Sequence, residues 1–94
     1  MKELNSLNED PAFRARRYIT TLTGVFEKTK TSTNDGSVAA ANVRRVTDSI
    51  QRYLQDAEHY LKEGRPSTSL ASVAYAEGLL DALILLDLAA VPAE

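Results

Sequence analysis

The sequence contains no cysteine among its 94 residues. This absence excludes disulfide bonds, thiolate metal sites and cysteine nucleophiles together. An excess of one charge is also missing, because 11 basic and 13 acidic residues leave a formal net charge of −2. A charge this small does not indicate a polyanionic or polycationic partner. The lack of cysteine fits a reducing compartment, and we expect a cytoplasmic protein.

Long hydrophobic runs are missing too. The most apolar stretch, residues 79–91, is interrupted by Asp81 and Asp87. It is shorter than the roughly 20 residues that a helix needs to cross a bilayer. The N-terminal residues have no apolar core of the kind found in a signal peptide. We therefore expect a soluble chain without a membrane partner.

The usual signatures of chemistry are absent from the sequence. It has no glycine-rich phosphate loop, no Gly-x-Ser-x-Gly, no His-Glu-x-x-His and no EF-hand loop. We expect no catalytic residues and no cofactor, and an enzymatic function lacks support. The segment around Arg14, Arg16 and Arg17 is locally basic. Without interleaved aromatic residues and with a negative net charge, it makes nucleic acid an improbable partner.

Helical periodicity is what the sequence does show. Asp10 and Pro11 form a helix start, since the first caps free N–H groups and the second has none to satisfy. Apolar residues then recur at steps of three and four, which predicts a helix over about residues 11–31. Ser37 caps a second segment over about residues 37–63, with an apolar stripe at Val43, Val46, Ile50, Tyr53, Ala57 and Tyr60.

A tight turn separates the second segment from a third. Gly64 is suited to a left-handed helix cap, and Pro66 is suited to a first helical position. A turn this short makes neighbouring helices antiparallel. With the third helix over about residues 66–89, the sequence predicts one all-α domain over residues 1–94. The expected fold is a three-helix bundle built on a long antiparallel helical hairpin.

The third segment carries two stripes at helical spacing. One is large and apolar (Leu70, Val73, Leu80, Leu83, Ile84), and the other is small (Ala71, Ala74, Gly78, Ala82). We expect the small stripe to make the close contact of the hairpin. Beyond Leu79 the segment is apolar nearly all round, which three helices cannot easily cover. We expect a homo-oligomer, with a dimer favoured, through the candidate interface residues Leu79, Leu83, Leu86 and Leu88.

A few polar residues are candidates for function. Arg52 and His59 resemble, in their Arg-x6-His spacing, the ribonuclease site of some members of the HEPN superfamily. The alternative for His59 is an exposed helix residue near Glu63.

Glu77 and Asp81 stand four apart in an apolar neighbourhood, where unpaired charge is costly. Together with Asp56 on the second helix they suggest a carboxylate metal site. The more ordinary alternative is that they meet arginine or tyrosine hydroxyl groups, or lie at the edge of the bundle.

Four stretches carry a resemblance to a known family: Tyr53-Leu-Gln-Asp-Ala, Tyr60-Leu-Lys-Glu-Gly, Leu70-Ala-Ser-Val-Ala-Tyr-Ala and Gly78-Leu-Leu-Asp-Ala. Together they resemble the archaeal domain-of-unknown-function family 357. The resemblance covers about residues 37–88 and departs from the family at residues 65–66. It implies a helical bundle from an archaeal cytoplasm with no assigned activity. Asp56, Tyr75 and Asp81 are the matching polar positions.

The sequence as a whole favours a non-enzymatic helical domain that self-associates or binds a protein partner. The over-apolar third segment and the missing catalytic motifs support this interpretation. Two alternatives stay open. One is a HEPN-like RNA-binding or ribonuclease domain that uses Arg52 and His59. The other is the carboxylate metal site.

Overall fold

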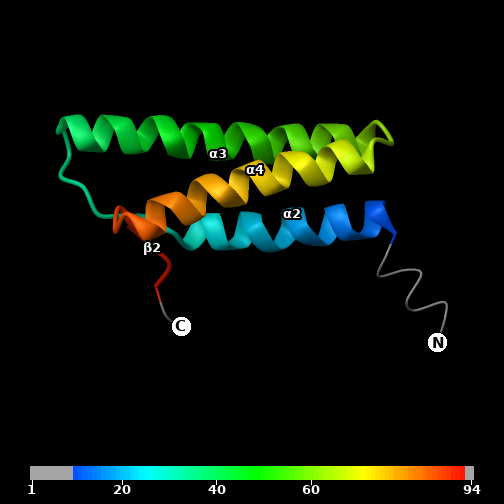
Figure 1. The fold of residues 1–94 in the computed structure, drawn as a ribbon, viewed down its shortest axis with the longest axis horizontal. Helices are drawn as coiled ribbons and strands as arrows, with labels where there is room; N and C mark the ends of the chain where they lie inside the picture. The colour runs from blue at the N-terminus through cyan, green and yellow to red at the C-terminus, as the bar shows by residue number, and fades with distance from the viewer. Residues whose placement is uncertain (1–9, 93–94) are drawn as a thin grey trace.

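A computed structural model describes residues 10–92 of the chain. Its helices are α2 (Pro11–Lys28), α3 (Val38–Lys62) and α4 (Pro66–Leu85), and two short strands are β1 (Lys30–Thr31) and β2 (Ala89–Ala90). Figure 1 shows α3 and α4 running in opposite directions, with α2 beside α4 and pointing the same way. The predicted all-α three-helix bundle on an antiparallel hairpin is confirmed.

Side chains cap the N-termini of α2 and α3, at the helix starts that the sequence predicts. The side chain of Asp10 accepts the N–H of Ala12 at 2.9 Å, directly before Pro11. The hydroxyl oxygen of Ser37 accepts the N–H of Ala40, also at 2.9 Å. Each bond satisfies one of the N–H groups that a helix N-terminus leaves without an internal partner.

The turn between α3 and α4 has the predicted geometry. Gly64 takes a positive φ of 76°. Its N–H donates to the carbonyl of Leu61 at 3.1 Å, and the N–H of Arg65 donates to the carbonyl of Tyr60 at 2.9 Å. This pair of bonds is a Schellman motif, which ends a helix through one left-handed residue. Because Pro66 then starts α4 directly, the two helices lie side by side.

Two helices end earlier than predicted. α2 stops at Lys28, and α4 stops at Leu85 because Asp87 takes a positive φ of 59°. That conformation turns the chain back, and Ala89–Ala90 pairs antiparallel with Lys30–Thr31. The apolar sequence after Leu85 contains no glycine that would signal this ending. The short strand pair joins the end of α4 to the connection between α2 and α3.

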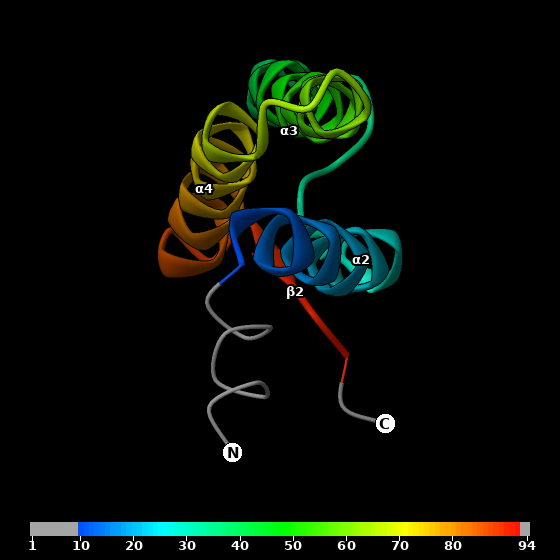
Figure 2. The ribbon, with the colours of Figure 1, turned by 90° about the vertical axis from the view of Figure 1, so that its right-hand side faces the viewer.

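The core lies between the three helices, and α4 contacts both of the others (Figure 2). Apolar side chains of all three helices and of β2 form one buried cluster: Ile19, Leu22, Val43, Ile50, Leu54, Ala57, Val73, Ala76, Leu80, Leu83 and Ala89. One polar contact crosses this core, where the buried hydroxyl of Ser69 donates to the carbonyl of Ala57 at 2.6 Å. The bundle is flattened, with Cα extents of 51 × 29 × 17 Å.

The small-residue stripe of α4 faces solvent, which corrects the prediction that it would make the hairpin contact. Ala71, Ala74, Gly78 and Ala82 are all exposed. A Cβ atom added at Gly78 would meet nothing within 4 Å. Val73, Leu80 and Leu83 of the larger stripe are buried instead, while Leu70 is half-buried and Ile84 is 37% exposed. The free energy gained on burial grows with apolar area, at about 25 cal/mol per Å², which favours burying large side chains.

α4 is also long and apolar enough, by length and mean hydropathy, to cross a membrane. Core helices of soluble proteins pass the same test when they are mostly buried, but only 33% of the apolar window of α4 is buried within the chain. The high mean hydropathy of α4 therefore reflects a helix that is apolar both on its buried side and on its exposed side.

Candidate functional site

The exposed side of α4 presents an unbroken line of apolar residues. We call this the outward face and define it by Ala71, Ala74, Tyr75, Gly78, Ala82, Leu85 and Leu86. Its large members are well exposed, with Tyr75 at 64%, Leu85 at 83% and Leu86 at 66%. The steps of three and four residues along this line keep its members on one side of the helix.

The outward face contains a shallow groove. One hollow is lined by Ala71, Ala74, Tyr75, Gly78 and Leu79. A second hollow shares two of these residues and reaches over α2, where it is lined by Phe13, Arg14, Arg17, Tyr18, Thr21, Leu70, Ala71 and Ala74. Because Ala71 and Ala74 line both, the two hollows adjoin. The small side chains leave the space, and the aromatic and arginine side chains border it.

Tyr75 lines the groove and packs against a second tyrosine on α3. The rings of Tyr53 and Tyr75 are stacked, with centroids 5.4 Å apart and an angle of 17° between their planes. Tyr75, a candidate from the sequence, thus touches α3 while most of its surface is open to solvent. Tyr60 lies apart from this pair, and its ring carries the guanidinium of Arg65 at 5.0 Å from the centroid.

Two acidic residues of α4 lie on its side toward α2. Glu77 and Asp81 are exposed, and the hydroxyl of Tyr18 on α2 donates a hydrogen bond to the Glu77 carboxylate. Burial, this hydrogen bond and the negative charges of Glu77 and Asp81 raise the pKa of Tyr18 to about 12. The carboxylates therefore lie at the bundle's edge, and Glu77 meets a tyrosine hydroxyl, which was the ordinary alternative.

The structure does not bring the proposed metal ligands together. Within residues 10–92, no three His, Asp or Glu side chains lie close enough to hold a metal ion. Asp56 is exposed on α3, whereas Glu77 is bonded to Tyr18 on α2. The alternative of a carboxylate metal site over Asp56, Glu77 and Asp81 therefore gains no support from the described residues.

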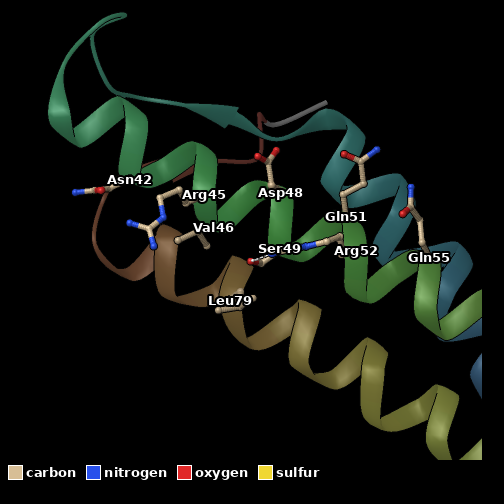
Figure 3. Close-up of a pocket in the computed structure, with 9 residues that line it drawn as sticks. All are labelled: Asn42, Arg45, Val46, Asp48, Ser49, Gln51, Arg52, Gln55 and Leu79. Carbon is tan, nitrogen blue, oxygen red and sulfur yellow. Dashed lines mark hydrogen bonds between the residues drawn. The ribbon is translucent and has the colours of Figure 1, made fainter.

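The arginine and histidine of the ribonuclease alternative are engaged in local contacts. His59 Nε2 lies 3.3 Å from the carboxylate of Glu63 one turn later, and both side chains are exposed. Arg52 donates to the hydroxyl of Ser49 at 3.0 Å. Figure 3 shows Arg52 lining an open polar groove on α3 together with Leu79 of α4, and His59 is not among the lining residues. The HEPN-like alternative gains no support from this arrangement.

The predicted interface leucines differ in where they lie. Leu83 is 3% exposed and belongs to the core of its own chain, so the structure removes it from the candidate interface. Leu79 and Leu88 are half-buried against that core, and Leu86 is open to solvent. Leu85, the most exposed leucine of the described residues, was missed. The spacing of the small stripe would have found it, because a step of three beyond Ala82 reaches Leu85.

The fold and this surface define a class of protein: a small helical bundle with one apolar face that residues 10–92 leave uncovered. Residues 17–89 match the family described as "Protein of unknown function (DUF357)". The match covers more than half of the chain, and the chain belongs to this family. The family assigns no activity. Comparison with curated proteins and with solved structures found no match to the chain.

Proposed function

We propose that this protein is a non-enzymatic helical domain that works by self-association through the outward face of α4. The observation that carries the proposal is that α4 is apolar on two opposite sides, while α2 and α3 cover only one of them. Contact between water and the exposed apolar side of α4 is unfavourable in free energy. A partner surface that covers this side removes it from water and lowers the free energy.

The exposed residues of the outward face present large apolar side chains to a partner. Burying a large side chain such as Leu85 or Leu86 is worth about 1.5–3 kcal/mol relative to full exposure. Contiguous apolar patches of this kind on soluble proteins mark interaction sites. α4 has 20 residues and is therefore about 30 Å long.

Sedimentation velocity over a wide range of protein concentration tests the proposal. We expect the apparent mass to rise from that of one chain to that of two as the concentration increases. Leu85→Glu should shift this transition to higher concentration, because a charge would have to be buried in the interface. Since Leu85 is 83% exposed, the variant should keep its helical circular dichroism.

Val38→Glu is the matched control. Val38 is 79% exposed and lies at the start of α3, outside the outward face. The substitution adds the same charge at an equally exposed apolar residue, and we expect no effect on association. A wild-type chain that stays monomeric at all concentrations would contradict the proposal, as would equal effects of the two variants.

A further inference from the structure

Resting on the proposed self-association, we infer that the partner is a second copy whose α4 packs antiparallel on the outward face, with the two helices crossing at Gly78. The symmetry of the face around this glycine supports the inference. Ala74 and Ala82 stand four residues before and after Gly78, and Ala71 and Leu85 stand seven before and after it. All of them are exposed on the same side of the helix.

An antiparallel crossing pairs residues that lie equally far from its centre, one before and one after. At the centre Gly78 meets its own symmetry mate, and Ala74 meets Ala82 of the second copy. No side chain then separates the two backbones, and the helix axes can approach to the short end of the usual range of about 8–10 Å. The open space around Gly78 in the single chain is what such an approach requires.

The same crossing places Leu85, one of the large side chains of the outward face, against a small one. Leu85 of the second copy falls opposite Ala71, where the groove is lined by Ala74 and bordered by Phe13 and Leu70. A parallel pair would instead set Leu85 against Leu85 and Ala71 against Ala71. It would crowd one end of the interface and leave a gap at the other, and both defects cost stability. The shape of the face therefore fits an antiparallel copy.

Charge favours the same orientation. Arg14 and Arg17 border the groove near Leu70 and Ala71, before Gly78, whereas Asp81 follows Gly78 on the same α2 side of the face. A two-fold axis that runs across α4, in the plane of the interface, places the α2 helices of both copies on the same side of the paired α4 helices. It also makes the two α2 helices run in opposite directions. The basic end of one edge then lies against Asp81 of the other copy. An axis along α4 would place each α2 edge against the other copy's α3 edge, where the pairing is lost.

The absence of cysteine makes the crossing measurable by disulfide trapping. A disulfide needs Cα atoms about 4.4–6.8 Å apart. In the antiparallel pair, Ala74→Cys and Ala82→Cys should cross-link when the two variants are mixed. Neither variant should cross-link with itself, since like positions are offset by eight residues, about 12 Å along the axis. A longer tag on one variant separates the heterodimer from either homodimer on a gel.

Gln51→Cys is the control for random collision, because Gln51 is exposed on α3 and lies outside the outward face. A parallel pair would reverse the result. Each single variant would then cross-link with itself, and the mixture would give no preference for the heterodimer. That outcome, in a chain that still dimerises by sedimentation, would overturn the antiparallel crossing and leave the proposed function standing. A chain that sediments only as a monomer would overturn both.

Charge reversal gives a second, independent readout. Arg17→Asp alone and Asp81→Arg alone should each weaken association by about tenfold, the change that corresponds to 1.4 kcal/mol. The double variant should recover most of this loss, since it restores opposite charges across the interface. Additive losses in the double variant would contradict the predicted pairing. If the chain instead binds vesicles of phosphatidylglycerol as a monomer, the outward face serves a lipid surface and the inference fails.

Discussion

The two faces of α4 are both apolar at helical spacing, yet they differ in side-chain size. The buried face carries Val73, Leu80 and Leu83, all 3% exposed or less. The centre of the outward face carries Ala74, Gly78 and Ala82, all exposed, and its large side chains Leu85 and Leu86 lie toward one end. The difference shows that the chain turned its bulkier stripe inward, where packing gains most from volume. What it left outside is a surface that suits the close approach of another backbone.

The sharpest test of this comparison is to remove one leucine from each face. Leu80→Ala should lower the free energy of unfolding by about 2–5 kcal/mol, because Leu80 is 2% exposed and its loss leaves a cavity. Leu85→Ala should change it by no more than about 0.5 kcal/mol in the monomer, because the side chain is exposed. Urea unfolding at concentrations where the chain is monomeric measures both. Comparable losses would mean that the assignment of the two faces is wrong.

A glycine-to-alanine pair sharpens the comparison further. Gly64→Ala should cost about 1–2 kcal/mol, since its φ of 76° is unfavourable for any residue with a Cβ atom. Gly78→Ala should instead stabilise the monomer by up to about 1 kcal/mol, because Gly78 is helical and a Cβ there meets open space. Urea unfolding of the two glycine variants, again at concentrations where the chain is monomeric, measures both changes. A destabilising Gly78→Ala in the monomer would show that something within the chain packs closely on that glycine.

Exchanging serine and alanine on the two faces should change the free energy of unfolding by a smaller amount. Ser69→Ala should cost about 0.5–1.5 kcal/mol, the usual net value of one hydrogen bond, because it removes the bond to the carbonyl of Ala57. The reverse change on the outward face, Ala71→Ser, should stay within about 0.5 kcal/mol, since water can bond to the added hydroxyl. Equal costs would indicate that Ala71 is covered by the chain itself.

Local signals in the sequence were sufficient for the helix starts and for the hairpin turn. Asp10, Ser37 and Gly64 act through bonds to residues within a few positions, so their roles can be predicted without the fold. The end of α4 could not be predicted in this way. Asp87 takes the left-handed conformation that glycine usually supplies, and β2 pairs with a strand almost 60 residues away.

The candidate site was predictable only in part. Periodicity identified two stripes on the third helix, but it cannot say which stripe a neighbouring helix will cover. The prediction therefore placed Gly78 in the hairpin contact and Leu83 in the interface, whereas Gly78 is exposed and Leu83 is buried in the core of its own chain. The partner of Glu77 was missed as an individual residue, because Tyr18 reaches it from α2, and the packing side of that helix depends on the whole fold.

The contact between Tyr18 and Glu77 gives the last and smallest prediction, and it concerns the border of the outward face. The pKa of Tyr18 is raised from its ordinary 10.0 to about 12, so the folded chain holds the phenolic proton more tightly than the unfolded chain does. The stabilisation is fully present below pH 10 and is lost as the pH rises from 10 through 12.

Tyrosinate absorbance should therefore show a late-titrating group that Tyr18→Phe removes. Glu77→Gln should lower the pKa of Tyr18 toward 10, because it removes a negative charge and a strong acceptor while burial still raises the pKa. An unchanged late titration in Glu77→Gln would mean that burial alone holds the proton and that Glu77 remains free to meet a partner at the edge of the face.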